Sequence, residues 1–192
     1  LESVGGELDL QNNDCLANIG GLRNLTTVGS HIRIEDNGAL TNIDGLGKLS
    51  SIGGLKISGD QPLQDLDGLE NLTNIRGGLT IEHTNLTNID GLRNVTTIGA
   101  LAIIFNDALT NLNGLDNLTH LGESGNITYM VYCNANLPSS EVDKLERQLS
   151  AAGWNGCRGT NPTCELYNFE PHGWCSCSFR PEPLPTCWIT EY

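Results

Sequence analysis

A short segment recurs along the first two thirds of the chain at nearly constant spacing. It reads GLRNLTTVG from residue 21, GLGKLSSIG from 45, GLENLTNIRG from 68, GLRNVTTIG from 91 and GLDNLTHLG from 114. The successive starts are 24, 23, 23 and 23 residues apart. A unit this small cannot bury its own apolar side chains, so the copies are predicted to stack into one elongated domain.

Short stretches of alternating apolar and polar residues lie between the copies. This alternation predicts strands with one buried face. The predicted inward pairs are Leu8/Leu10, Ile32/Ile34, Leu55/Ile57, Leu79/Ile81, Leu101/Ile103 and Tyr129/Val131. We expect these strands to run parallel in one sheet, with the recurring segment forming the opposite wall as extended chain or short helical turns.

Each predicted strand is followed by a polar side chain that can bond backbone groups and stack as a ladder. These residues are Asn13, Asn37, Asp60, Thr84, Asn106 and Asn134. A column of leucines follows and is predicted to point inward: Leu16, Leu40, Leu63, Leu86, Leu109 and Leu137.

The resulting pattern, LxIxxNxxLTNIDGLxNLTxIGG, resembles the receptor L-domain repeat of insulin and epidermal growth factor receptors and of many microbial surface proteins. The resemblance covers residues 1–156. It implies a mainly β fold, a right-handed leucine-rich-repeat-like β-solenoid of six coils. It does not imply a particular ligand, because members of the family bind unrelated partners.

A helix over residues 140–152 is predicted to close the last coil. Ser139 or Ser140 is expected to cap its start and Gly153 to end it. Its apolar face consists of Val142, Leu145 and Leu149.

Residues 157–192 are predicted to form a small disulfide-rich tail. Six of the seven cysteines crowd the last third of the chain: Cys133, Cys157, Cys164, Cys175, Cys177 and Cys187. This density indicates disulfides in an oxidising compartment rather than zinc ligands, because paired CxxC units are lacking and His172 stands alone.

The cysteine spacing of the tail resembles the second half of an epidermal growth factor-like module. That resemblance implies the pairs Cys133–Cys164, Cys157–Cys175 and Cys177–Cys187, and the alternative is that Cys133 staples the capping helix by pairing with Cys157. Because seven is odd, Cys15 is predicted to be free or to bond a cysteine outside this segment or in another chain.

Six Asn-x-Thr sequons predict N-linked glycans and the same extracellular compartment. They are Asn24, Asn71, Asn85, Asn94, Asn117 and Asn126. Four of them, Asn24, Asn71, Asn94 and Asn117, share one phase of the repeat, so a copied structural turn is the competing explanation for those four.

Composition excludes several functions. The net charge of -13 disfavours nucleic acid and acidic membrane surfaces, and no apolar run approaches the length of a membrane span. The four histidines, His31, His83, His120 and His172, fall at different repeat phases, and no catalytic or nucleotide-binding motif occurs, so we expect no enzyme and no cofactor. The column Asp44, Asp67, Asp90 and Asn113 is interpreted as stabilising turns, with calcium binding a minor alternative.

The outward face of the predicted sheet changes from polar to apolar along the chain. Its two columns are Asp9, Arg33, Lys56, Thr80, Ala102, Met130 and Gln11, Glu35, Ser58, Glu82, Ile104, Tyr132. The apolar end, Ala102, Ile104, Met130 and Tyr132, is a candidate contact patch, unless the cysteine-rich tail covers it.

These observations favour a secreted, non-catalytic glycoprotein that contacts other protein chains. The first hypothesis is a structural subunit of a surface layer or filament, because the first coil has no visible cap over Leu8 and Leu10. The alternative is an adhesion or ligand-recognition ectodomain that binds a protein or glycan through the outer strand face.

Overall fold

A computed structural model describes residues 1–59, 62–122, 127–154 and 157–158. The protein is mainly β, with parallel strands, five short 3-10 helices and one α-helix in these residues. The strands are β1 (Ser3–Val4), β2 (Leu8–Gln11), β3 (Thr27–Val28), β4 (His31–Glu35), β5 (Ser51–Ile52), β6 (Gly54–Ser58), β7 (Asn74–Glu82), β8 (Thr97–Ile104), β9 (His120–Leu121), β10 (Ile127–Tyr132) and β11 (Cys157–Arg158). The helices are η1 (Gly20–Leu22), η2 (Asp44–Leu46), η3 (Asp67–Leu69), η4 (Asp90–Leu92), η5 (Asn113–Leu115) and α1 (Ser139–Ala151).

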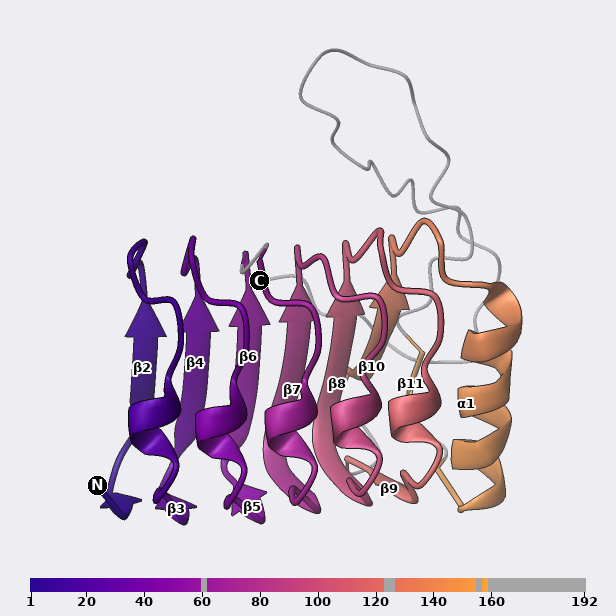
Figure 1. The fold of residues 1–192 in the computed structure, drawn as a ribbon. Coiled ribbons are helices and arrows are strands. Elements are labelled where there is room, and N and C mark those ends of the chain that lie inside the picture. The colour runs from indigo at the N-terminus through magenta and orange to yellow at the C-terminus, as the bar shows by residue number, and fades with distance from the viewer. Residues whose placement is uncertain (60–61, 123–126, 155–156, 159–192) are drawn as a thin grey trace, which may run out of the picture.

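Strands one repeat apart pair in chain order. The main sheet runs β2-β4-β6-β7-β8-β10-β11, β5 and β9 extend it beside β7 and β8, and β1 pairs separately with β3. Figure 1 shows this sheet behind a row of 3-10 helices. The register aligns Asp9, Arg33, Lys56, Thr80, Ala102 and Met130 across successive strands, so the predicted outward column is confirmed.

The core lies between the sheet and the row of 3-10 helices. The predicted inward residues of β4, β6, β7 and β8 are almost fully buried, as are Leu40, Leu63, Leu86 and Leu109 of the leucine column. At the ends of the stack, Leu8, Leu10, Leu16 and Leu137 are only partly buried. The first strand therefore presents a half-covered edge, as the sequence predicts.

Successive 3-10 helices pack in unusually close contact. A Cβ added at Gly68 would overlap the carbonyl oxygen of Ile43, and one added at Gly91 would overlap that of Leu66. Neither glycine holds a positive φ. The recurring glycine is therefore required by close approach of the next repeat rather than by backbone conformation.

The polar ladder is present wherever its positions are described. Asn106 is fully buried, donates to the carbonyl oxygens of Ile81 (2.9 Å) and Ile104 (3.0 Å), and accepts from the Thr84 backbone amide (3.1 Å). Asn134 continues the pattern by donating to Ile103 at 2.9 Å. The ladder thus satisfies buried backbone groups where the chain turns out of each strand. Asp60 lies outside the described residues.

Helix α1 closes the last repeat, within one residue of its predicted bounds. Leu145 and Leu149 are buried in the core, and the Gln148 amide donates to the carbonyl oxygens of Leu115 and Leu118, both at 2.8 Å. Gly153 holds a φ of +92°, which suits its predicted role in ending the helix.

The predicted serine cap of α1 is wrong. The N-cap residue is Pro138, in an extended conformation, and no side chain bonds the first turn. Ser139 is already helical, so its hydroxyl is not placed to cap. Glu141 in the first turn accepts instead from the Leu112 backbone amide of the preceding repeat, at 3.2 Å.

Most of the predicted cysteine-rich tail, including Cys164, Cys175, Cys177 and Cys187, lies outside the described residues. Cys133 is disulfide-bonded, and Cys15 is a free, exposed thiol.

Candidate ligand-binding face

Arg33 and Lys56, on the polar half of the sheet face, both pair with carboxylates. Arg33 pairs with Glu7 at 2.8 Å, and Lys56 lies between two carboxylates, 2.9 Å from Glu35 and 3.1 Å from Glu82. The pKa of Lys56 is raised, chiefly by its hydrogen bonds to Glu35 and Glu82. The two cations of this region are thus held by neighbouring repeats.

The apolar half contains the predicted contact patch. Met130 lies beside Ala102, and Tyr132 lies beside Ile104, because β10 and β8 are paired in that register. Ala102 is buried, whereas Ile104, Met130 and Tyr132 are half-buried. The structure therefore brings the four predicted residues together on two adjacent strands.

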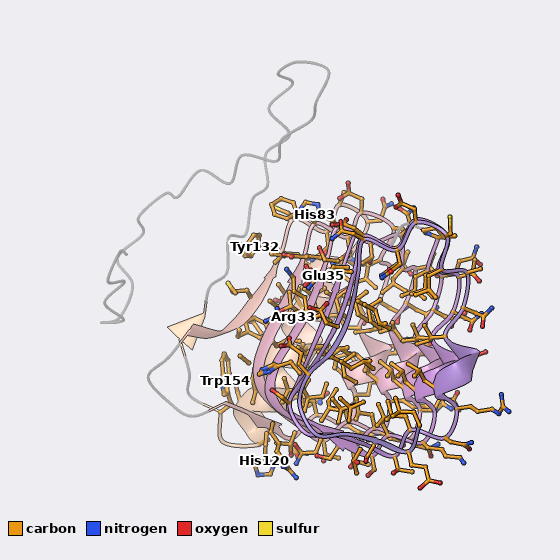
Figure 2. The ribbon with its side chains drawn as sticks, turned by 90° about the vertical axis from the view of Figure 1, so that its left-hand side faces the viewer. Arg33, Glu35, His83, His120, Tyr132 and Trp154 are labelled. Carbon is orange, nitrogen blue, oxygen red and sulfur yellow. The ribbon has the colours of Figure 1, made fainter. Side chains whose placement is uncertain are left out.

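Two aromatic side chains extend this patch at the carboxyl ends of the strands. The ring of His83 stacks on Phe105, with centroids 4.8 Å apart, and Tyr132 meets Phe105 edge-on at 6.2 Å. Figure 2, which looks along the stack from its N-terminal end, shows His83 and Tyr132 near the upper end of the sheet, with Glu35 and Arg33 below them. We call Ala102, Ile104, Met130, Tyr132, Phe105 and His83 the apolar-aromatic patch.

His83 and Phe105 occupy left-handed backbone positions. The equivalent residues of successive repeats all have positive φ: Asn12, Asp36, Gly59, His83, Phe105 and Cys133. Asn, Asp, His and Gly tolerate this conformation, whereas a bulky residue such as phenylalanine is strained in it. The half-buried Phe105 therefore holds a costly position without filling the core. Such outliers concentrate at functional sites.

His83 and Phe105 were not predicted to belong to the patch, and His83 stood out in the sequence only as one of four histidines at different repeat phases. The sequence signal for these two residues was the position directly after each strand, where Asn12, Asp36 and Gly59 are followed in later repeats by His83 and Phe105.

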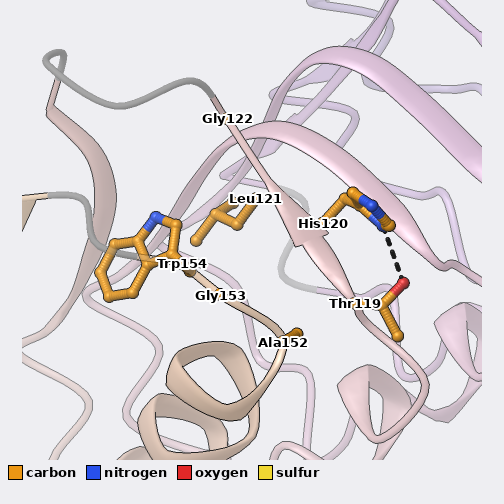
Figure 3. Close-up of a pocket in the computed structure, with 7 residues that line it drawn as sticks. All are labelled: Thr119, His120, Leu121, Gly122, Ala152, Gly153 and Trp154. Atoms are coloured by element: carbon orange, nitrogen blue, oxygen red, sulfur yellow. Dashed lines mark hydrogen bonds between the residues drawn. The ribbon is translucent and has the colours of Figure 1, made fainter.

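A small pocket lies between β9 and the end of α1. It has a volume of about 120 Å³ and is lined by Thr119, His120, Leu121, Gly122, Ala152, Gly153 and Trp154. Figure 3 shows Trp154 and His120 on its walls, and the Thr119 hydroxyl lies 2.9 Å from Nδ1 of His120. Its walls adjoin residues 123–126 and 155–156, which the structure does not describe.

The other predicted sites are dispersed. Asn24, Asn71, Asn85, Asn94 and Asn117 are exposed, and Asn126 lies outside the described residues. Within the described residues, no three histidine, cysteine or acidic side chains are grouped to hold a metal ion, and none of the helices there is long and apolar enough to span a membrane. Asp44, Asp67, Asp90 and Asn113 each begin a 3-10 helix, as their turn-forming interpretation requires.

The stack and its exposed sheet define a repeat domain that offers one broad face for contact. Among known protein families, residues 52–137 match the family described as Receptor L domain. The match covers β6, β7, β8, β9 and β10 and confirms the resemblance over these residues. Neither the curated proteins nor the solved structures include a significant match.

Receptor L domains are typically extracellular, non-enzymatic modules that bind protein ligands. The match therefore indicates an extracellular ligand-binding domain and lends no support to a filament subunit, the first hypothesis from sequence. The match does not extend to the tail, so its likeness to an epidermal growth factor-like module stays unsupported.

Proposed function

We propose that the chain is a non-catalytic, glycosylated ectodomain that recognises a protein ligand through the apolar-aromatic patch. In this account residues 1–156 form a right-handed solenoid of six coils, and the sheet face is the contact surface. The observation that carries the proposal is the grouping of Ile104, Met130, Tyr132 and Phe105 on β8, β10 and the turn after β8.

The face suits a protein partner because it combines an apolar centre with a charged margin. Aromatic residues and methionine are enriched at the centres of protein interfaces, where a few buried side chains carry most of the binding energy. Glu82 borders the patch in the same register as Ile104, and Thr80 in the same register as Ala102. Since the chain carries a net charge of -13, a ligand with basic residues around an apolar centre fits best.

The proposal is tested by titrating the immobilised full chain with a panel of purified extracellular domains. Met130→Glu places a charge in the patch, and Arg23→Glu places the same residue on the exposed wall after η1. We expect a panel member to bind the wild-type chain and to lose about tenfold or more in affinity with Met130→Glu, which corresponds to about 1.4 kcal/mol. Arg23→Glu is expected to leave affinity unchanged. Absence of any binder, or equal effects of the two variants, would overturn the proposal.

A further inference from the structure

Three sequons in the same repeat phase use their asparagine side chains to join adjacent repeats. Nδ2 of Asn71 donates to the Gly47 carbonyl oxygen at 2.7 Å, that of Asn94 to Glu70 at 2.6 Å, and that of Asn117 to Arg93 at 2.8 Å. Each acceptor is the residue that ends the 3-10 helix of the preceding repeat. The amide nitrogen therefore stabilises the stack at the position where a glycan would be attached.

The threonines of the same sequons are used in the same way. The Thr73 hydroxyl donates to Ser50 at 3.0 Å, that of Thr96 to Thr73 at 3.3 Å, and that of Thr119 to Thr96 at 3.2 Å, in each case to a backbone carbonyl one repeat back. Stacking alone thus accounts for both polar residues of the Asn-x-Thr pattern, which explains its recurrence without glycosylation.

Asn24 has the same sequence pattern but a different environment. It follows η1, its side chain is exposed, and its Oδ1 accepts from Nζ of Lys48 at 3.0 Å. Among the described residues, Nδ2 of Asn24 has no hydrogen-bond partner. A glycan there displaces no contact between repeats.

We propose that the folded, secreted protein carries an N-linked glycan on Asn24 and leaves Asn71, Asn94 and Asn117 unmodified. Glycosylation replaces one of the two N–H groups of the side-chain amide and places a sugar on the nitrogen that lies 2.6–2.8 Å from a carbonyl oxygen of the preceding repeat in these three residues. Their glycans would also start on adjacent layers only about 5 Å apart, the spacing of neighbouring strands. Chains modified at these positions therefore stack less well and contribute little to the folded product.

The consequence for function is that the glycan and the ligand occupy different walls. Asn24 lies after η1, in the row of 3-10 helices, whereas the apolar-aromatic patch lies on the sheet (Figure 1). The proposal rests on the extracellular location in the proposed function. Its test needs no ligand, so the two can fail separately.

The experiment expresses the full chain in eukaryotic secretory cells and measures the occupancy of each sequon in the secreted protein by glycopeptide mass spectrometry. We expect Asn24 to be mostly occupied and the other three to be mostly bare. Predominant occupancy of Asn71, Asn94 or Asn117 in folded protein, or a bare Asn24, would overturn the proposal.

Two matched variants separate the structural role from the glycan. Asn24→Ala is expected to remove one glycan mass and leave the melting temperature nearly unchanged. Asn94→Ala is expected to leave the glycan mass unchanged and to lower the melting temperature by a few degrees, because a hydrogen bond between repeats is lost. The opposite pattern contradicts the assignment. If Asn94→Ala is not secreted, the occupancies of the wild-type protein decide the question.

Discussion

The imidazole ring of His83 lies parallel to the ring of Phe105, with an angle of 7° between their planes, although both residues hold φ angles near +55°. The stacked rings connect the carboxyl ends of two neighbouring strands, β7 and β8. A stacked pair contributes about 0.5–1.5 kcal/mol, while a left-handed conformation costs about 1–2 kcal/mol for a bulky residue such as Phe105. The stack therefore does little for folding, and we interpret it as a ligand contact.

Phe105→Asn tests this interpretation, because asparagine occupies the equivalent left-handed position at Asn12. Loss of the ring contact and relief of backbone strain oppose each other, so the free energy of unfolding is expected to change by less than about 1 kcal/mol. Ligand affinity is expected to fall tenfold or more, about 1.4 kcal/mol, as measured by titration calorimetry. Retained affinity with Phe105→Asn would remove Phe105 from the binding surface.

The repeated glycine offers a test of the close stacking of repeats. Gly91→Ala is expected to destabilise the fold by about 1–3 kcal/mol, because its Cβ overlaps the carbonyl oxygen of Leu66. Gly21 occupies the same phase in the first copy, where a Cβ meets nothing within 4 Å, so Gly21→Ala is the matched control. Chemical denaturation of both variants measures the difference, and equal stabilities would contradict the packing described here.

We expect substitution of Asn106, in the buried part of the polar ladder, to lower the stability of the fold strongly. Asn106→Ala leaves the Ile81 and Ile104 carbonyls and the Thr84 amide without this partner inside the protein, and such groups cost about 1–3 kcal/mol each when left unsatisfied. Asn13 occupies the same phase in the first copy but is exposed, so Asn13→Ala is expected to cost far less. Thermal unfolding compares the two, and a similar loss for both would show that burial does not set the energetics of the ladder.

We expect the ion pairs of Lys56 to make the stability of the fold depend on pH. Its pKa in the folded protein is raised above the ordinary value of 10.5, mainly by hydrogen bonds to Glu35 and Glu82. The stability from this interaction is therefore fully present below about pH 10.5 and is lost as the pH rises through the folded-state pKa. Lys56→Met is expected to lower stability at neutral pH and to reduce the alkaline decline.

Urea unfolding between neutral and strongly alkaline pH measures this effect, with Lys48→Met as the control because Lys48 contacts Asn24 rather than a carboxylate. If the free energy of unfolding falls at alkaline pH by the same amount in the wild type and in Lys56→Met, the ion pairs of Lys56 contribute nothing to stability.

Much of the sheet could be predicted from sequence because its side chains obey a strict period. Inward pairs such as Ile32/Ile34 and outward neighbours such as Arg33 and Lys56 fall where alternation and the repeat length place them. Alternation also located Ile104 and Met130 on the apolar end of the face.

Other features depend on contacts that no local pattern encodes. His83 and Phe105 follow the last residues of their strands, where alternation no longer assigns a face and only the backbone conformation brings the rings together. The bond from the Leu112 amide to Glu141 depends on how α1 docks on the preceding repeat, which the sequence of the helix alone does not specify.

The most direct test of the ligand-binding face is hydroxyl-radical footprinting of the full chain, alone and with the extracellular domain that binds it. We predict that oxidation of Met130, Tyr132 and Phe105 falls when the ligand is bound, while oxidation of Trp154, beside the small pocket at the end of α1, stays the same. Protection of Trp154 with continued oxidation of Met130 and Tyr132 would contradict the account and place the ligand elsewhere.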